Sequence, residues 1–345
     1  MRTAIEAASV MNPHPNPRVG AVVLDRNGRV VGRGVHEGPG LPHAEANALD
    51  DAGTSADGGT LVVTLEPCNH HGRTPPCTQA ILDAGIQKVV VGVADPDADA
   101  AGGVARLRDA GMAVEMGVLA DEVVAIDPGY FHHRRTGRPR VTLKTAITLD
   151  GQAAARDGTS QWITSPAARD DVHRLRSNSD AVMVGAGTVL KDNPDLSVRL
   201  PGYEGPQPIP VVIAGTRPFP NNLRVVERNA VIFSPAVRDL DTEVVVIESG
   251  DHVDLQEALF ELGSRGIVDL LVEGGPILAD SLLEARLIDR CIFYLGAKLA
   301  AGSGEPPFHG AFRTITDAID VHVEDVRTVG PDVRIEFTLA PAEVA

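Results

Sequence analysis

Two segments of the first half decide the fold: Pro42-His43-Ala44-Glu45, at the start of a predicted helix over 44–52, and Glu66-Pro67-Cys68, after a predicted strand over 60–64. Cys77 follows Cys68 nine positions later. One imidazole and two thiolates are a sufficient protein set for a catalytic zinc ion, which keeps a fourth position open. We therefore predict a zinc site formed by His43, Cys68 and Cys77.

Glu45 is the predicted catalytic residue beside that site. Two residues rotate a helix by roughly 200°, so His43 and Glu45 can converge only where the chain turns into the helix. Zinc lowers the pKa of bound water to about 7, and a carboxylate can then move the water proton to a ring nitrogen and to departing ammonia. The alternative is that His43 is a surface or capping residue and the two cysteines are buried apolar residues. The remaining cysteine, Cys291, lies in an apolar run and is predicted to belong to the core.

Strands and helices alternate along both halves of the chain, which favours layered α/β domains. In the first half, strands are predicted at 20–24, 30–31, 60–64 and 88–94, and helices at 2–11, 44–52, 78–84 and 104–110. The pattern restarts beyond the basic stretch 134–139. Strands are predicted there at 141–148, 181–184, 210–214, 231–234, 244–248, 270–273 and 333–339, and helices at 255–262 and 277–285. We expect two domains, 1–138 and 139–345.

Composition excludes several classes of protein. The 345 residues include 31 basic and 47 acidic side chains, a formal net charge of -16, which argues against a non-specific nucleic-acid or anionic-membrane binder. No apolar run approaches the roughly 20 residues of a membrane helix, and three cysteines suggest the reducing cytoplasm. The window 134–199, with 11 basic and 7 acidic residues, is locally positive. It either holds an anionic ligand or is a chance cluster on a solvated face.

The first-half motifs resemble the zinc cytidine-deaminase superfamily, whose general signature has two residues between its cysteines. The eight residues here, Asn69-His70-His71-Gly72-Arg73-Thr74-Pro75-Pro76, are similar to the deaminase half of the bifunctional riboflavin-biosynthesis family, RibD. Pro15-Asn16-Pro17-Arg18-Val19-Gly20 also matches. The resemblance implies a three-layer cytidine-deaminase-like domain in which Asn16 reaches the pyrimidine. It implies further substrate contacts from His70, Arg73, Asp95 and Asp97.

Motifs of the second half resemble the reductase domain of the same family. They include Thr142-Leu143-Lys144, Thr148-Leu149-Asp150-Gly151, Ser160-Gln161-Trp162-Ile163-Thr164-Ser165 and Val272-Glu273-Gly274-Gly275-Pro276. The resemblance implies a dihydrofolate-reductase-like fold that binds NADPH and reduces a ribosyl side chain to ribityl. The implied cofactor-binding residues are Ala146, Trp162, Thr188, Asp192, Gly215, Gly274, Gly275 and Pro276. The implied substrate residues are Lys144, Asp150, Ser160, Arg176, Leu196, Arg199 and Glu273.

Physical arguments support part of this second site. Gly275-Pro276 lies between a predicted strand and a predicted helix, where backbone N–H groups and the helix dipole can face a pyrophosphate. A Rossmann site does not fit, because Gly185-Ala186-Gly187-Thr188-Val189-Leu190 lacks the third glycine. Arg176 and Arg199 lie in the positive window and suit a substrate phosphate, which arginine can hold bidentately.

Three functions remain open from the sequence. The resemblance implies a homo-oligomeric enzyme that deaminates 2,5-diamino-6-ribosylamino-4(3H)-pyrimidinone 5′-phosphate and then reduces its ribosyl group. The alternatives are a nucleic-acid adenosine or cytidine deaminase with an unrelated tail, and a non-catalytic zinc-stabilised binding protein. Asp97 departs from the family pattern, which has an asparagine near the ribosyl phosphate. Because like charges repel, we expect weakened binding of the deaminase substrate.

Overall fold

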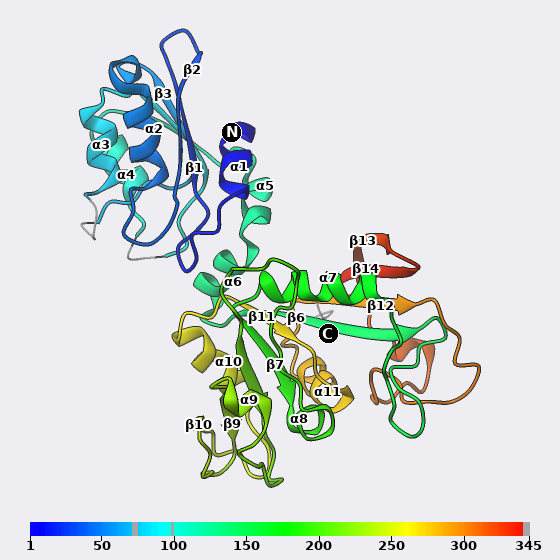
Figure 1. Cartoon of the computed structure of the whole chain (residues 1–345). Coiled ribbons are helices and arrows are strands. Elements are labelled where there is room, and N and C mark those ends of the chain that lie inside the picture. Colours follow the sequence, from blue (N-terminus) through cyan, green and yellow to red (C-terminus); the bar gives the residue numbers. More distant parts are fainter. Residues whose placement is uncertain (71–74, 98–99, 341–345) are drawn as a thin grey trace. The chain divides into compact units, whose positions relative to one another are not determined.

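The computed structural model describes residues 1–70, 75–97 and 100–340, and it divides the chain into two compact units, Met1–Thr136 and Gly137–Ala345. The division falls inside the basic stretch at 134–139 (Figure 1). Arg73, one of the predicted substrate contacts, lies outside the described residues. Among the described residues, no helix combines the length and apolar character required to cross a membrane.

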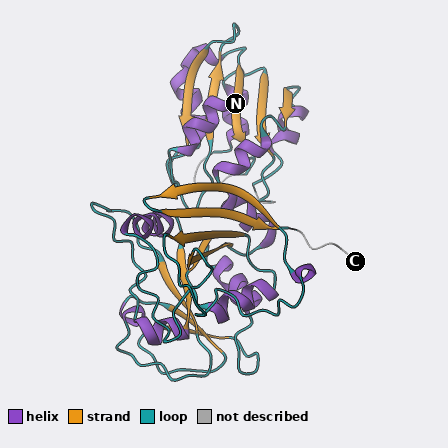
Figure 2. Cartoon of the chain, turned by 90° about the vertical axis from the view of Figure 1, so that its right-hand side faces the viewer, coloured by secondary structure: helices purple, strands orange, loops and turns teal. Residues whose placement is uncertain are grey.

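The first unit is a three-layer α/β domain around a five-stranded sheet of order β2-β1-β3-β4-β5. Its strands are β1 (Gly20–Leu24), β2 (Val30–Val35), β3 (Thr60–Leu65), β4 (Lys88–Val93) and β5 (Ala113–Met116). Its helices are α1 (Arg2–Ser9), α2 (Ala44–Ala52), η1 (Gly53–Ala56), α3 (Cys77–Asp83), α4 (Gly103–Asp109), α5 (Ala120–Ile126) and α6 (Pro128–Thr136). The sheet lies between α2, α3 and α4 on one face and α1 and α5 on the other (Figures 1 and 2).

Close packing of α2 on the sheet fixes where the first site lies. A Cβ on Gly34 of β2 would lie 2.1 Å from the carbonyl oxygen of Ala44, so only glycine lets the helix approach this closely. Strands β3 and β4 are parallel, and the loops that follow them therefore leave the same edge of the sheet. The start of α2 and these two loops carry the described candidate residues of the first half except Asn16, which precedes β1.

The second unit contains a nine-stranded sheet of order β10-β9-β8-β7-β11-β6-β12-β14-β13. The strands are β6 (Arg140–Thr148), β7 (Ala181–Gly185), β8 (Ile209–Ile213), β9 (Val231–Ser234), β10 (Glu243–Val246), β11 (Asp269–Val272), β12 (Arg290–Gly296), β13 (Val321–Val329) and β14 (Asp332–Leu339). The strands from β10 to β12 in that order are mutually parallel, and β14 and β13 add antiparallel pairings.

Helices cover both faces of the parallel part of this sheet. The helices of this unit are α7 (Pro166–Ser177), α8 (Ala186–Asp192), α9 (Arg224–Glu227), α10 (Leu255–Ser264), α11 (Pro276–Glu284) and η2 (Ile315–Asp317). Met183 of β7 packs into a core with α10 and α11, whereas its neighbour Val182 packs into a second core with α8 and α9. Alternate residues of one strand thus serve two cores, which explains the continuous apolar runs.

Most predicted elements are present, with ends shifted by a few residues. The helix over 44–52 and the strands over 20–24 and 231–234 have the predicted bounds. Cys291 is confirmed as a core residue: it lies on β12 with 2% exposure, and burial raises the pKa of its thiol to about 12. Among the strands and α-helices, the predicted elements do not include β5, β12, β13, α5, α6, α7, α8 or α9.

Candidate active sites

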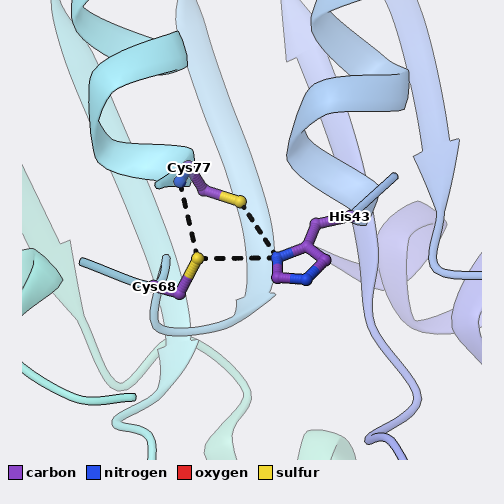
Figure 3. Close-up of side chains that lie close together, drawn as sticks. All are labelled: His43, Cys68 and Cys77. Atoms are coloured by element: carbon purple, nitrogen blue, oxygen red, sulfur yellow. Dashed lines mark hydrogen bonds between the residues drawn. The ribbon is translucent and has the colours of Figure 1, made fainter. Parts of the chain in front are cut away.

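Three elements bring the predicted metal ligands together. His43 is the residue that precedes α2, Cys68 lies in the loop after β3, and Cys77 is the first residue of α3. The His43 Nδ1 atom lies 3.2 Å from Cys77 Sγ and 3.5 Å from Cys68 Sγ (Figure 3). All three ligand atoms lie within 4.8 Å of one another. This buried pair of sulfurs facing one imidazole nitrogen fits a zinc ion by donor type and number.

The two thiols have opposite pKa shifts. The pKa of the Cys68 thiol is lowered to about 4. The hydrogen bond from Cys77 is the main cause, burial opposes it, and His43 acts in the same direction as Cys77. The same hydrogen bond and burial raise the pKa of Cys77. One proton shared by two sulfurs therefore stabilises a single thiolate in the metal-free chain. A divalent cation would stabilise both thiolates, because its charge favours deprotonation of each coordinating thiol.

Glu45 lies in the first turn of α2, next to the ligand group and with only 3% exposure. Burial raises the pKa of its carboxyl group to about 7, against backbone hydrogen bonding and the neighbouring His43. A carboxyl group with a pKa near the working pH can both accept and release a proton. The position and protonation of Glu45 therefore suit a proton carrier beside the metal ligands.

Asn16 and the loop after β4 flank this group. The Asn16 Nδ2 atom lies 2.8 Å from Nε2 of His36. The Asp95 carboxylate accepts hydrogen bonds from the Asp97 backbone N–H and the Tyr130 hydroxyl, and burial raises the pKa of Asp95. His70 is exposed at the end of the described part of the loop that carries Cys68.

A second carboxylate, Glu66, connects the loop that carries Cys68 to the segment that follows β4. Its oxygens accept backbone N–H groups from Asp95 at 3.3 Å, Gly102 at 3.2 Å and Val104 at 2.9 Å. Sequence reasoning missed Glu66, although its place two residues ahead of Cys68 was an available signal. It also missed His36, which no spacing rule connects to Asn16.

In the second unit, the structure brings Lys144, Arg176 and Glu273 together. Arg176, only 8% exposed, donates from Nε and Nη2 to the two Glu273 oxygens at 2.6 and 3.1 Å, and from Nη1 to the Ser197 carbonyl at 2.9 Å. Burial opposes ionisation of Glu273, but the charges of Arg176 and Lys144 hold its pKa below the usual range. Burial lowers the pKa of Lys144. The guanidinium group of Arg176 is thus hydrogen-bonded on each of its three nitrogens to other groups of the protein.

Four of the predicted cofactor residues, Thr188, Gly274, Gly275 and Pro276, lie close after the ends of β7 and β11. Gly275 precedes α11, and Pro276 is the first residue of that helix. A Cβ on Gly275 would lie 3.7 Å from Oγ1 of Thr188 in α8, and no other neighbour lies nearer. Crevices at the carboxyl ends of parallel strands, with a helix N-terminus facing them, are places where phosphorylated ligands bind.

Other predicted residues surround or support this region. Trp162 is 57% exposed, lies 4.3 Å from the Arg169 guanidinium, and lines a cavity of about 310 Å³ together with Ser160. Ala146 is half-buried on β6, and Asp192 and Arg199 are exposed. The Gly215 carbonyl accepts a hydrogen bond from Arg238.

The side chains of Asp150 and Leu196 are engaged by the protein itself. The Asp150 carboxylate accepts hydrogen bonds from Thr148 Oγ1 and the backbone N–H groups of Ala300 and Ala301, and these lower its pKa to about 2. Leu196 is 2% exposed in the core that α8 and α9 cover. Both residues shape the backbone around the site.

Comparison with known proteins agrees with this division. Residues 139–335 match the model of the RibD C-terminal domain, and residues 1–93 match the cytidine and deoxycytidylate deaminase zinc-binding region. The riboflavin biosynthesis protein RibD of Mycobacterium tuberculosis is 42% identical over 94% of this chain and 91% of that protein.

Solved structures agree over the whole chain. Acinetobacter baumannii RibD has a TM-score of 0.88 and 34% identity, over 99% of this chain and 98% of that one. A Thermotoga maritima structure described as a diaminohydroxyphosphoribosylaminopyrimidine deaminase/5-amino-6-(5-phosphoribosylamino)uracil reductase has a TM-score of 0.85 and 36% identity, over 99% and 97% of the two chains. The cytidine-deaminase-like and dihydrofolate-reductase-like domains expected from the motifs are confirmed, and the chain belongs to the RibD family of riboflavin-biosynthesis enzymes.

Proposed function

We propose that this chain deaminates 2,5-diamino-6-ribosylamino-4(3H)-pyrimidinone 5′-phosphate in domain 1–138 and reduces the ribosyl group of the product to ribityl in domain 139–345. The observation that carries the proposal is the convergence of His43, Cys68 and Cys77 within 4.8 Å, with the buried Glu45 beside them. A zinc-stabilised binding protein would not require a buried carboxyl group with a pKa near 7.

In the deaminase site, His43, Cys68 and Cys77 would hold zinc. The ion supplies Lewis acidity, which makes hydroxide available at neutral pH. Glu45 accepts the proton that water loses as its oxygen bonds to the ring carbon. Glu45 then passes that proton to the ring nitrogen, and a further proton transfer lets the amino group leave as ammonia while a carbonyl remains. Asn16 contacts the pyrimidine, and His70, Asp95 and Asp97 are further substrate contacts, with Asp97 near the ribosyl phosphate. Arg73, which lies outside the described residues, is proposed as a substrate contact from the motif alone.

In the reductase site, NADPH supplies the hydride for the sugar C1. The backbone N–H groups of Gly274 and Gly275 and the N-terminus of α11, which Pro276 begins, would face its pyrophosphate, and the remaining cofactor contacts come from Ala146, Trp162, Thr188, Asp192 and Gly215. The substrate lies among Lys144, Asp150, Ser160, Arg176, Leu196, Arg199 and Glu273. Lys144 can donate a proton readily because burial lowers its pKa. The exposed Arg199 is the arginine with room to bind the phosphate.

One experiment tests both activities. Zinc-loaded protein is incubated with the diaminopyrimidine ribosyl phosphate, with NADPH, with NADH or with neither. We expect ammonia in all three reactions and the ribityl product with NADPH. Glu45→Ala should abolish ammonia release but leave reduction of the separately supplied uracil intermediate. Loss of both activities in a folded Glu45→Ala protein would refute the two-site assignment.

We also propose that the enzyme is a homo-oligomer that uses the exposed face of the edge strand β13. A β-bulge between Val323 and Asp325 keeps Val321, Val323 and Val326 on one face, opposite Leu339, Phe337 and Ile335 of β14. The three valines are 46%, 50% and 59% exposed. A contiguous exposed apolar face on an edge strand favours pairing with another chain.

The oligomer proposal is tested by light scattering after gel filtration. Val323→Glu places a charge in the centre of the apolar face without changing a core residue. We expect the wild-type chain to elute as an oligomer and the variant as a monomer. A monomeric wild-type protein at micromolar concentration would contradict the proposal.

A further inference from the structure

His36 connects two segments of the first site. It directly follows β2, is 4% exposed, and its backbone N–H donates to the Val19 carbonyl at 3.0 Å. Its ring nitrogens face different partners: Nδ1 lies 3.1 Å from the Pro42 carbonyl, and Nε2 lies 2.8 Å from Asn16 Nδ2. One imidazole therefore contacts the residue ahead of His43 and the side chain assigned to the pyrimidine.

These partners determine the hydrogen-bond direction. A carbonyl oxygen can only accept, so Nδ1 of His36 carries the hydrogen and donates it to Pro42. In the neutral ring Nε2 is then an acceptor, and Asn16 must donate to it from its amide nitrogen. The reverse orientation of the amide would require an imidazolium. Burying that charge would be costly, because no described carboxylate forms an ion pair with His36.

The orientation of the amide decides what Asn16 can recognise. With Nδ2 held by His36, the Oδ1 atom is the end of the amide available to a ligand. This oxygen can accept a hydrogen bond from an amino group or a ring N–H, and it offers nothing to a ligand carbonyl. Without His36, the amide could rotate and present either end.

We infer that His36 is a positioning residue, which fixes the Asn16 amide so that its oxygen recognises an N–H donor on the pyrimidine. The inference rests on the proposed deaminase function, in which Asn16 contacts the ring. It adds that recognition depends on a side chain outside the motif that carries Asn16. The Pro42 contact also ties this recognition to the segment containing His43 and Glu45.

The variants separate positioning of Asn16 from a general structural effect. His36→Phe keeps a planar ring at the position but removes both hydrogen bonds. His36→Gln retains a donor and an acceptor, and Asn16→Ala removes the recognising amide. His252→Phe, the same substitution at an exposed histidine of the second unit, serves as the matched control. Zinc content and the reductase rate of the same chain report on folding.

Steady-state ammonia release on the zinc-loaded chain gives the result. We expect His36→Phe to raise the deaminase KM about tenfold with a smaller change in kcat, as for the loss of one oriented hydrogen bond. Because His36 acts through Asn16, the double variant should match Asn16→Ala within about twofold. His36→Gln should recover most of the loss, and His252→Phe should resemble wild type.

Two results would overturn the inference while leaving the deaminase function intact. One is that His36→Phe raises the deaminase KM by the same factor in the Asn16→Ala background as in the wild type. The other is lower kcat and zinc content at unchanged KM, which would show that His36 acts on the metal-ligand segment. Absence of ammonia release by the zinc-loaded wild type would instead contradict the proposed function itself.

Discussion

The Arg134 guanidinium lies 3.5 Å from the Asp97 carboxylate, so this negative charge has a positive neighbour on α6. Arg134 also lies over the Tyr130 ring, whose hydroxyl donates to Asp95. The guanidinium offsets part of the repulsion that Asp97 would exert on a phosphate. The weaker substrate affinity expected from the sequence stays a prediction, but the expected size of the effect is smaller.

Asp97 and Arg134 can be tested as a pair. Because both side chains are partly exposed, their interaction is worth less than about 1 kcal/mol. Asp97→Asn should therefore lower the deaminase KM by a few-fold at most. Arg134→Met should raise KM severalfold in the wild type and less in the Asp97→Asn background. Equal effects in both backgrounds, measured by ammonia release, would show that the residues act independently.

Zinc binding should release protons. In the metal-free chain the pKa of Cys68 is lowered to about 4 and that of Cys77 is raised, so near pH 7 one thiol is protonated and must ionise to bind the metal. We expect zinc affinity to rise at least tenfold per pH unit between pH 6 and 8. Competition with a chelator measures the slope, and a pH-independent affinity would argue against this ligand set.

Glu45 should destabilise the metal-free protein at alkaline pH. Its pKa is raised from 4.5 to about 7 in the folded chain, so the folded state binds more protons than the unfolded state between these values. Stability therefore falls as pH rises through this window, by up to about 3 kcal/mol. Glu45→Gln should remove that loss.

The Glu45 effect is measured by urea unfolding of metal-free protein, followed by circular dichroism. Glu45→Gln should unfold at a higher urea concentration than the wild type at pH 8, with the difference much reduced at pH 4.5. A difference that stays constant with pH would mean that ionisation of Glu45 is not its cause.

Breaking the Arg176–Glu273 pair should affect the second unit alone. The two side chains are only 10% and 12% exposed, and removing one member of a buried ion pair typically costs about 3–5 kcal/mol. Arg176→Met should therefore destabilise this unit and abolish NADPH oxidation, while ammonia release persists. Arg176→Lys keeps the charge but loses the bidentate geometry, and should retain partial activity. Equal loss of both activities would contradict this independence.

Gly275→Ala tests whether the start of α11 binds the pyrophosphate of the cofactor. The backbone there has φ −74°, which any residue can adopt, and the added Cβ would meet Thr188 Oγ1 at 3.7 Å, an ordinary contact. The variant should fold normally, but its methyl group would occupy space beside the pyrophosphate. We expect the KM for NADPH to rise about tenfold or more. Gly310→Ala, with nothing within 4 Å of its Cβ, is the control and should leave that KM unchanged.

How far the sequence predicts this molecule depends on which signal each element carries. The zinc motif could be predicted because His43, Cys68 and Cys77 lie where strands and helices meet. The helix over 44–52 could be predicted with its bounds because it ends at a glycine. Helix α7 was missed because Ala168 and Val172 are its only buried apolar residues, and the charged Arg176 takes the next inward position. Strand β13 is exposed along most of its length and has no alternating burial pattern.

Interactions between distant segments were beyond sequence reasoning. Asn16, His36 and Pro42 meet through hydrogen bonds, and Arg134 reaches Asp97 from a helix that the periodicity did not indicate. Likewise, Arg176 is predicted to bind a phosphate because arginine suits phosphate, whereas three of its five N–H groups already bind Glu273 and Ser197. Residue type suggests a ligand class, but competing partners are visible only in three dimensions.

The anchoring by Glu66 has a consequence for how this enzyme can change during evolution. Its carboxylate binds backbone N–H groups of Asp95, Gly102 and Val104, and every residue except proline supplies such a group. The side chain at position 97 can therefore be exchanged without touching these three anchors. Gly103 cannot be exchanged, because a Cβ there would lie 1.7 Å from the Pro67 carbonyl oxygen. We thus expect substitutions of Asp97 to change substrate binding and to leave the metal ligands in place.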